Sequence, residues 1–125
     1  MTMPAGRYYV GDLCYVIRDR SDWDAVVANA FPDDGDGRGV DGEFTLPDGR
    51  RYAMFSTAYG DGEYYDAEGR RYLVDAGSIG CIRLEDIRDL DDERIFFDGG
   101  QIIEFPIPFE CDSNGFLITF GHVYI

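Results

Sequence analysis

The chain has 125 residues, a length that suits one domain with a single core and requires neither a metal nor disulfides for stability. Its 25 acidic and 11 basic residues give a net charge of −14, which repels any polyanion at physiological salt. We therefore expect a single domain over residues 1–125 that does not bind nucleic acid directly.

The acidity has three explanations. All basic residues are arginines and lysine is absent, which suits a GC-rich genome or a halophilic source in which acidic surfaces stay soluble. The functional explanation is a DNA mimic, whose carboxylates imitate a phosphate backbone and occupy a basic groove on a partner. We weigh the two compositional causes above mimicry, because charge of this size bears on solubility before it bears on function.

Three cysteines, Cys14, Cys81 and Cys111, lie inside apolar segments. Their odd number and wide spacing predict buried free thiols in a reducing compartment. The first residues hold no basic segment followed by an apolar run, and no window approaches the roughly 18 apolar residues of a membrane span. We expect a cytoplasmic protein that does not bind a membrane.

The first elements combine strands with one helix. Residues 8–10 predict a strand, which Gly11 and Asp12 interrupt as a bulge or corner before the apolar run 13–17 resumes it. Apolar residues then recur at helical spacing over 21–30. Ser21 is the expected cap of this helix, with Asp24 three residues on, and Trp23 is expected to anchor it to the sheet.

The rest of the chain alternates strand-like segments with turns rich in glycine and aspartate. Further strands are expected at 78–83 and 122–125, and one or two helical turns at 84–88. Four hairpins are predicted: 43–46 with 51–56, 63–65 with 70–74, 95–97 with 101–105, and 109–111 with 116–120. The expected fold is mainly β, an α+β arrangement in which a twisted antiparallel sheet folds into a sandwich or partly open barrel with one helix packed on it.

The stretch 55–82 holds the densest mixture of tyrosine, acidic residues and glycine. Tyrosine gives apolar bulk with a polar tip and is common at interfaces. We therefore predict a non-catalytic binding or inhibitor domain that engages a basic protein surface, with its oligomeric state left open. The predicted contact residues are Asp12, Tyr59, Asp61, Tyr64, Tyr65 and Asp75.

The alternative class is a small hydrolase. In such an enzyme the only histidine, His122, would be the base for Cys14 or Cys81, and Asp75 or Asp12 would orient it. Paired carboxylates for acid–base chemistry are a second route, drawn from Asp61, Glu63, Asp66 and Asp75. Nothing in the sequence places any of these residues together.

Metal and cofactor sites are not expected. Three cysteines and one histidine match a zinc set in number, but their wide spacing is unlike that of known sites. Asp34, Asp36 and Asp41 form a weak calcium alternative, although Arg38 and Thr45 stand where an EF-hand loop needs ligands. The chain also lacks a glycine-rich phosphate loop between a strand and a helix.

Three segments carry a resemblance: residues 6–16 (GRYYVGDLCYV), 55–62 (FSTAYGDG) and 74–81 (VDAGSIGC). The chain resembles a group of small uncharacterised bacterial and phage proteins that carry Gly-Asp-Pro-Cys-Tyr, Tyr-Gly-Asp-Gly and Val-Asp-Ser/Ala-Gly segments in this order. Here Leu13 replaces the proline of the first segment, so the corner at Asp12 is expected to be less rigid. The resemblance implies a prokaryotic or viral origin and no activity.

Overall fold

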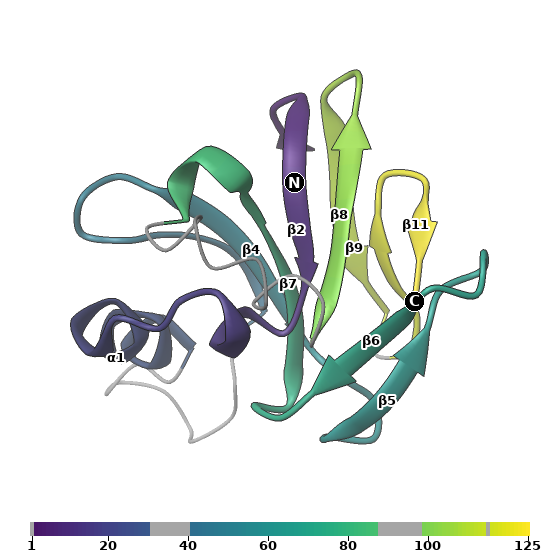
Figure 1. Cartoon of the computed structure of the whole chain (residues 1–125), viewed down its shortest axis with the longest axis horizontal. Coiled ribbons are helices and arrows are strands. Elements are labelled where there is room, and N and C mark those ends of the chain that lie inside the picture. The colour runs from purple at the N-terminus through teal and green to yellow at the C-terminus, as the bar shows by residue number, and fades with distance from the viewer. Residues whose placement is uncertain (1, 31–40, 88–98, 115) are drawn as a thin grey trace.

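The protein is described by a computed structural model that covers residues 2–30, 41–87, 99–114 and 116–125. These residues form three antiparallel sheets in a sandwich-like arrangement with no closed barrel among them, and a single α-helix (Figure 1). The mainly β prediction with one packed helix is therefore confirmed. No helix in the described ranges is long and apolar enough to cross a membrane.

The largest sheet has five strands in the order β3-β4-β7-β2-β8. Its strands are β2 (Gly6–Gly11), β3 (Gly42–Thr45), β4 (Arg51–Ser56), β7 (Ser78–Arg83) and β8 (Gly100–Phe105). The second sheet has the order β1-β9-β10-β11 and consists of β1 (Thr2–Met3), β9 (Phe109–Ser113), β10 (Ile118–Phe120) and β11 (Val123–Tyr124). A separate hairpin pairs β5 (Gly62–Tyr65) with β6 (Arg71–Val74).

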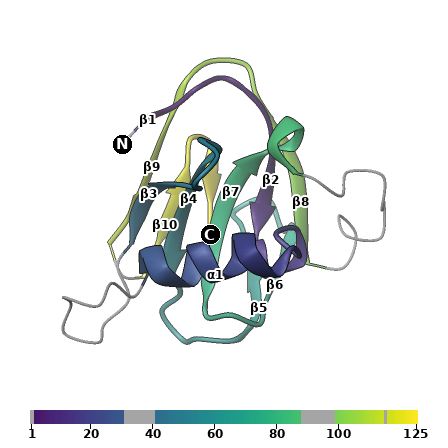
Figure 2. The same cartoon turned by 90° about the vertical axis from the view of Figure 1, so that its left-hand side faces the viewer.

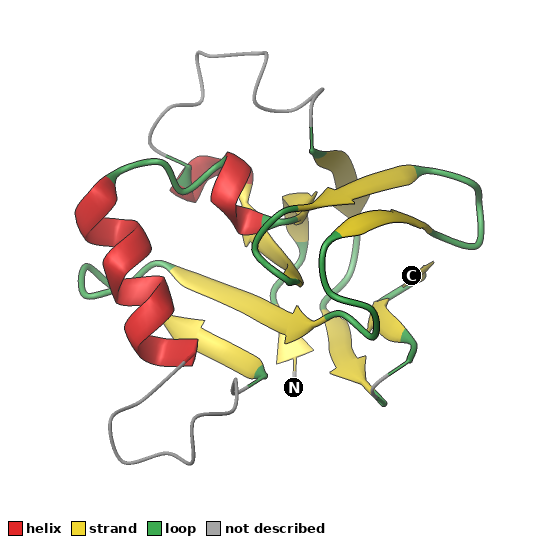
Figure 3. Ribbon diagram, turned by 90° about the horizontal axis from the view of Figure 1, so that it is seen from below, coloured by secondary structure: helices red, strands yellow, loops and turns green. Residues whose placement is uncertain are grey.

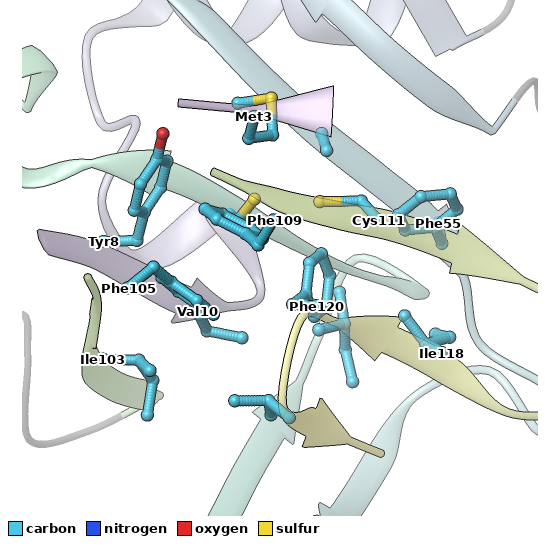
Figure 4. Close-up of a cluster of buried hydrophobic side chains, with 14 of the residues drawn as sticks. Met3, Tyr8, Val10, Phe55, Ile103, Phe105, Phe109, Cys111, Ile118 and Phe120 are labelled. Atoms are coloured by element: carbon cyan, nitrogen blue, oxygen red, sulfur yellow. The ribbon is translucent and has the colours of Figure 1, made fainter. Parts of the chain in front are cut away.

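The three central strands of the five-stranded sheet, β4, β7 and β2, are buried on both faces. In β4, Ala53 and Phe55 point into a core shared with the second sheet, whereas Tyr52 and Met54 point to the side of the helix. Figure 4 shows the first of these cores, in which the Phe105 and Phe109 rings stack 3.7 Å apart. Because side chains alternate between the faces of a strand, a strand covered on both sides is apolar throughout.

The helix α1 (Arg20–Ala30) lies across the outer face of this sheet (Figure 2). Trp23 packs against the apolar cluster beneath it, as predicted. The predicted cap was wrong: the Asp19 carboxylate accepts the backbone N–H of Asp22 at 3.1 Å, so the helix begins at Arg20 and Ser21 lies inside it.

The predicted corner after the first strand is present, but the strand does not resume. β2 ends at Gly11, and residues 13–15 form a short 3₁₀-helix, η1 (Leu13–Tyr15). The Asp12 side chain caps η1 by accepting the N–H of Cys14 at 3.0 Å. The apolar run that suggests a strand is instead the buried side of this turn, where Leu13 is fully covered.

Two of the predicted hairpins, β3–β4 and β5–β6, are confirmed by their antiparallel pairing. The pairing of β9 with β10 confirms a third, although β10 begins two residues later than expected, at Ile118. β7 and the terminal strand β11 also form, and a second 3₁₀-helix, η2 (Leu84–Asp86), occupies the predicted helical turns. The strand predicted at 95–97, and with it the hairpin to 101–105, lies outside the described residues.

Candidate functional site

A hollow of about 460 Å³ opens on the surface beside the β5–β6 hairpin. We call it the aromatic hollow, and its lining residues are Ala58, Tyr59, Asp61, Gly62, Glu63, Tyr64, Tyr65, Phe116 and Ile125. Three of its rings are well exposed: Tyr59 at 82%, Phe116 at 81% and Tyr65 at 56%. Large apolar side chains gathered at one exposed place are typical of an interaction site.

The turn before β5 is fixed by hydrogen bonds, so Tyr59 is presented from a defined backbone. The N–H of Thr57 donates to the carbonyl of Gly77 at 3.0 Å, and its hydroxyl donates to that of Gly60 at 2.7 Å. The Tyr64 hydroxyl donates to the same Gly60 carbonyl at 2.7 Å and accepts the N–H of Tyr59 at 3.2 Å. Gly60 has a φ of +71°, which a side chain would disfavour.

The far end of the hairpin is held by Asp66, which is buried. One carboxylate oxygen accepts the N–H groups of Glu68 and Arg70, and the other accepts the Arg70 guanidinium at 2.6 Å and the Tyr72 hydroxyl at 2.7 Å. Burial works against the charge of Asp66, but these hydrogen bonds outweigh it and lower its pKa. The charged carboxylate is therefore a structural part of the turn.

The structure places Asp12 in a different role from the one predicted. Asp12 is fully buried, so it does not reach a partner. One oxygen accepts the N–H of Cys14, and the other accepts those of Asp75 and Ala76 at 2.8 and 2.7 Å. The expectation that Asp12 contributes to the contact surface is thus wrong, and its carboxylate instead ties η1 to the segment 75–77.

The other predicted contact residues fall into two neighbouring groups. Tyr59, Tyr64 and Tyr65 line the aromatic hollow together with Asp61. Asp75 is exposed and accepts the hydroxyl of Tyr15, but it does not line the hollow. The Asp61 carboxylate also lies close to Gly77, two residues after Asp75 in the chain.

Two lining residues were missed by sequence reasoning. The sequence predicts Phe116 as the start of a strand, but it precedes β10 and is exposed at the hollow. It predicts Ile125 as part of a final strand, with no link to the tyrosines. Both stand more than fifty residues beyond the tyrosines in the chain, and no local pattern signals a contact over that separation.

The cysteine–histidine alternative gains no geometric support. Burial, and then the nearby Asp12 carboxylate, raise the pKa of the Cys14 thiol well above its ordinary value. Burial and the neighbouring Cys111 do the same for the fully buried Cys81. His122 is exposed beside the Phe105 ring, and no hydrogen bond links it to a cysteine within the described ranges. Neither sulfur is therefore an activated thiolate.

The prediction of buried free thiols holds for Cys81 and Cys111, whereas Cys14 is only half-buried. For the calcium alternative, Asp34 and Asp36 lie outside the described residues. Asp41 accepts the backbone N–H and the hydroxyl of Ser56 at 2.8 and 3.0 Å. Where the structure is described, no group of three acidic, cysteine or histidine side chains is arranged to hold a metal ion.

Comparisons with protein-family models, with curated proteins and with solved structures find no match to this chain. The resemblance to small bacterial and phage proteins therefore stays a prediction. Function has to be argued from the aromatic hollow itself.

Proposed function

We propose that this domain acts by binding, without a chemical step, and that it engages a basic segment of another protein through the aromatic hollow. The observation that carries the proposal is the exposure of Tyr59, Tyr65 and Phe116 around one hollow. Exposed rings held on a fixed backbone bury much area at little entropic cost when a partner covers them.

The charge around the hollow selects the partner. Asp61 and Glu63 line it, and the whole chain carries a net charge of −14. Arginine and lysine side chains are attracted both to carboxylates and to the faces of aromatic rings. A basic partner is steered toward this surface over long range, while an anionic one is repelled.

The experiment begins with a display library of random peptides selected on the immobilised protein. We expect arginine- or lysine-rich peptides to be enriched, and their affinity to fall as salt is raised. Binding of one enriched peptide is then measured by fluorescence anisotropy for the wild type and for the double variant Tyr59→Ala/Phe116→Ala.

A matched control is available at Ile107, which is 70% exposed and does not line the hollow. We expect the double variant to bind at least about tenfold more weakly, because truncating anchor rings at an interface costs more than about 1 kcal/mol each. Ile107→Ala is expected to bind like the wild type. Enrichment of acidic or uncharged peptides, or equal binding by all three proteins, would overturn the proposal.

A further inference from the structure

The β5–β6 hairpin has one covered edge and one open edge. β6 is covered on its outer side, where the Leu73 N–H donates to the Gly99 carbonyl at 3.1 Å and the Arg71 carbonyl accepts from the Gln101 side chain at 3.0 Å. Among the described strands, β5 pairs with β6 alone. In Figure 1, β5 is the outermost strand at the lower right, with β6 between it and β8.

The register decides which residues of β5 face the open edge. The Asp66 N–H donates to the Arg70 carbonyl at 3.0 Å, so in this pair the backbone groups face each other across the hairpin. In an antiparallel ladder such pairs alternate with pairs whose N–H and C=O groups point outward. The outward pairs are therefore Tyr65 with Arg71 and Glu63 with Leu73.

The contacts of β6 agree with this assignment, because it is the outward groups of Arg71 and Leu73 that reach Gln101 and Gly99. On β5, the outward groups are one N–H and one C=O from each of Glu63 and Tyr65. In the described part of the chain, no hydrogen bond occupies any of these four groups. Unpaired groups in a row are a template for another strand.

The aromatic hollow follows this edge. Tyr64 lies on one face of β5 and packs against the core. Glu63 and Tyr65 lie on the other face, where the Tyr65 hydroxyl donates to the Glu63 carboxylate at 3.2 Å. Residues from both faces line the hollow, as expected when a hollow runs along the edge of a strand. Phe116 and Ile125 supply lining from the C-terminal part of the chain.

We propose that an extended basic segment of the partner adds to β5 as a third strand, with an arginine side chain seated in the aromatic hollow against Tyr59 and Asp61. This rests on the function proposed above and specifies how the partner is held. Main-chain bonds to Glu63 and Tyr65 supply affinity, and the hollow supplies the preference for a cationic side chain.

A second copy of this chain fits the edge poorly. Each copy carries Asp61 and Glu63 at this edge and a net charge of −14, so two copies repel each other where their β5 strands would meet. The charge that disfavours self-pairing favours a basic strand. Edge strands are commonly kept from self-association by such inward or flanking charges.

The first test is amide hydrogen exchange of the full chain, with and without an enriched basic peptide. We expect the Glu63 and Tyr65 amides to exchange freely in the protein alone and at least about tenfold more slowly in the complex. The Tyr64 amide, which faces β6, should be protected in both states and serves as the internal control. Unchanged exchange at Glu63 and Tyr65 in a complex that forms would overturn strand addition.

The second test removes one outward donor. Glu63→Pro deletes an N–H that the β5–β6 ladder does not use, so the hairpin tolerates it, and Glu63→Ala removes the same charge while keeping the N–H. We expect the proline variant to bind the peptide about fivefold to tenfold more weakly than the alanine variant, because it loses one hydrogen bond to the added strand. Equal affinities of the two variants would refute strand addition, whatever the circular dichroism of each shows.

The outcomes separate the two proposals. If no basic peptide is enriched, the proposed function fails and strand addition fails with it. Basic peptides could bind and require Tyr59 and Phe116 while neither test shows that the β5 backbone takes part. In that case only strand addition is overturned. A dimer in sedimentation that the Glu63→Pro variant abolishes would make the occupant a second copy and would also overturn the proposal.

Discussion

The fully buried carboxylate of Asp12 offers the sharpest test of how the site is supported. It accepts the N–H of Cys14 at 3.0 Å, of Asp75 at 2.8 Å and of Ala76 at 2.7 Å, and so joins two segments more than sixty residues apart. Asp12→Ala removes both carboxylate oxygens and with them all three hydrogen bonds. It leaves the strand β2 itself unchanged, because the Asp12 backbone stands just after its end at Gly11.

The expected loss follows from the burial of the three donors. An N–H left without a partner costs about 1–3 kcal/mol when it is buried and less when water reaches it. Cys14 is half-buried, while Asp75 and Ala76 are exposed residues, so we take the low end for each. The sum is about 3 kcal/mol of unfolding free energy. Asp12→Asn keeps the shape and one acceptor oxygen, and we expect it to lose about half as much.

The measurement is urea denaturation followed by tryptophan fluorescence, since Trp23 is the only tryptophan. The control is Asp24→Ala, because Asp24 is exposed on α1 and surface substitutions of this kind usually change stability by less than about 0.5 kcal/mol. If Asp12→Ala lies within about 1 kcal/mol of this control, the carboxylate does not hold the segment 75–77, and the account of the network is wrong.

Three further predictions concern the hairpin and the central sheet. Because its pKa is lowered, charged Asp66 stabilises the fold above its unfolded pKa of 3.8, and this contribution is lost as pH falls through the lower folded value; Asp66→Asn should therefore flatten the fall in melting temperature below that pH. Tyr64→Phe leaves the Gly60 carbonyl with only the Thr57 hydroxyl and frees the Tyr59 N–H, so Tyr59 and Gly60 should show faster backbone motion by NMR relaxation, with a loss of about 1 kcal/mol of unfolding free energy. Gly80→Ala should cost about 1–3 kcal/mol in urea denaturation, because the added Cβ overlaps the Ala53 carbonyl oxygen.

The elements that sequence predicted correctly are those set by local chemistry. In the β3–β4 hairpin, Pro47 presets the turn and Gly49 takes a φ of +97°, so the strands on either side are set by the turn between them. The helix was predicted within one residue because its apolar spacing is also local. Its cap was missed because Ser21 and Asp19 are both good capping residues, and only the backbone shows which is used.

The errors fall where a distant contact decides the local conformation. The apolar run after Asp12 is compatible with a strand, and it becomes η1 because the Asp12 carboxylate bonds Cys14 on one side and the segment 75–77 on the other. The apolar character of β4 correctly predicted a strand. It did not show that two separate cores cover the two faces of that strand. Figure 3, a view from below, shows the helix α1 and the β5–β6 hairpin on opposite sides of the molecule.

The open edge of β5 belongs to a class of site that side-chain patterns do not reveal. Every residue except proline carries an N–H and a C=O, so composition says nothing about which of these groups lack a partner. The Asp66–Arg70 bond fixes which pairs of the hairpin point outward, and a turn longer or shorter by one residue would shift that alternation. Under that shift Tyr64, which now anchors the turn before β5, would face the other side of the strand. The same register thus determines both the presentation of Tyr59 and the backbone groups offered to a partner strand.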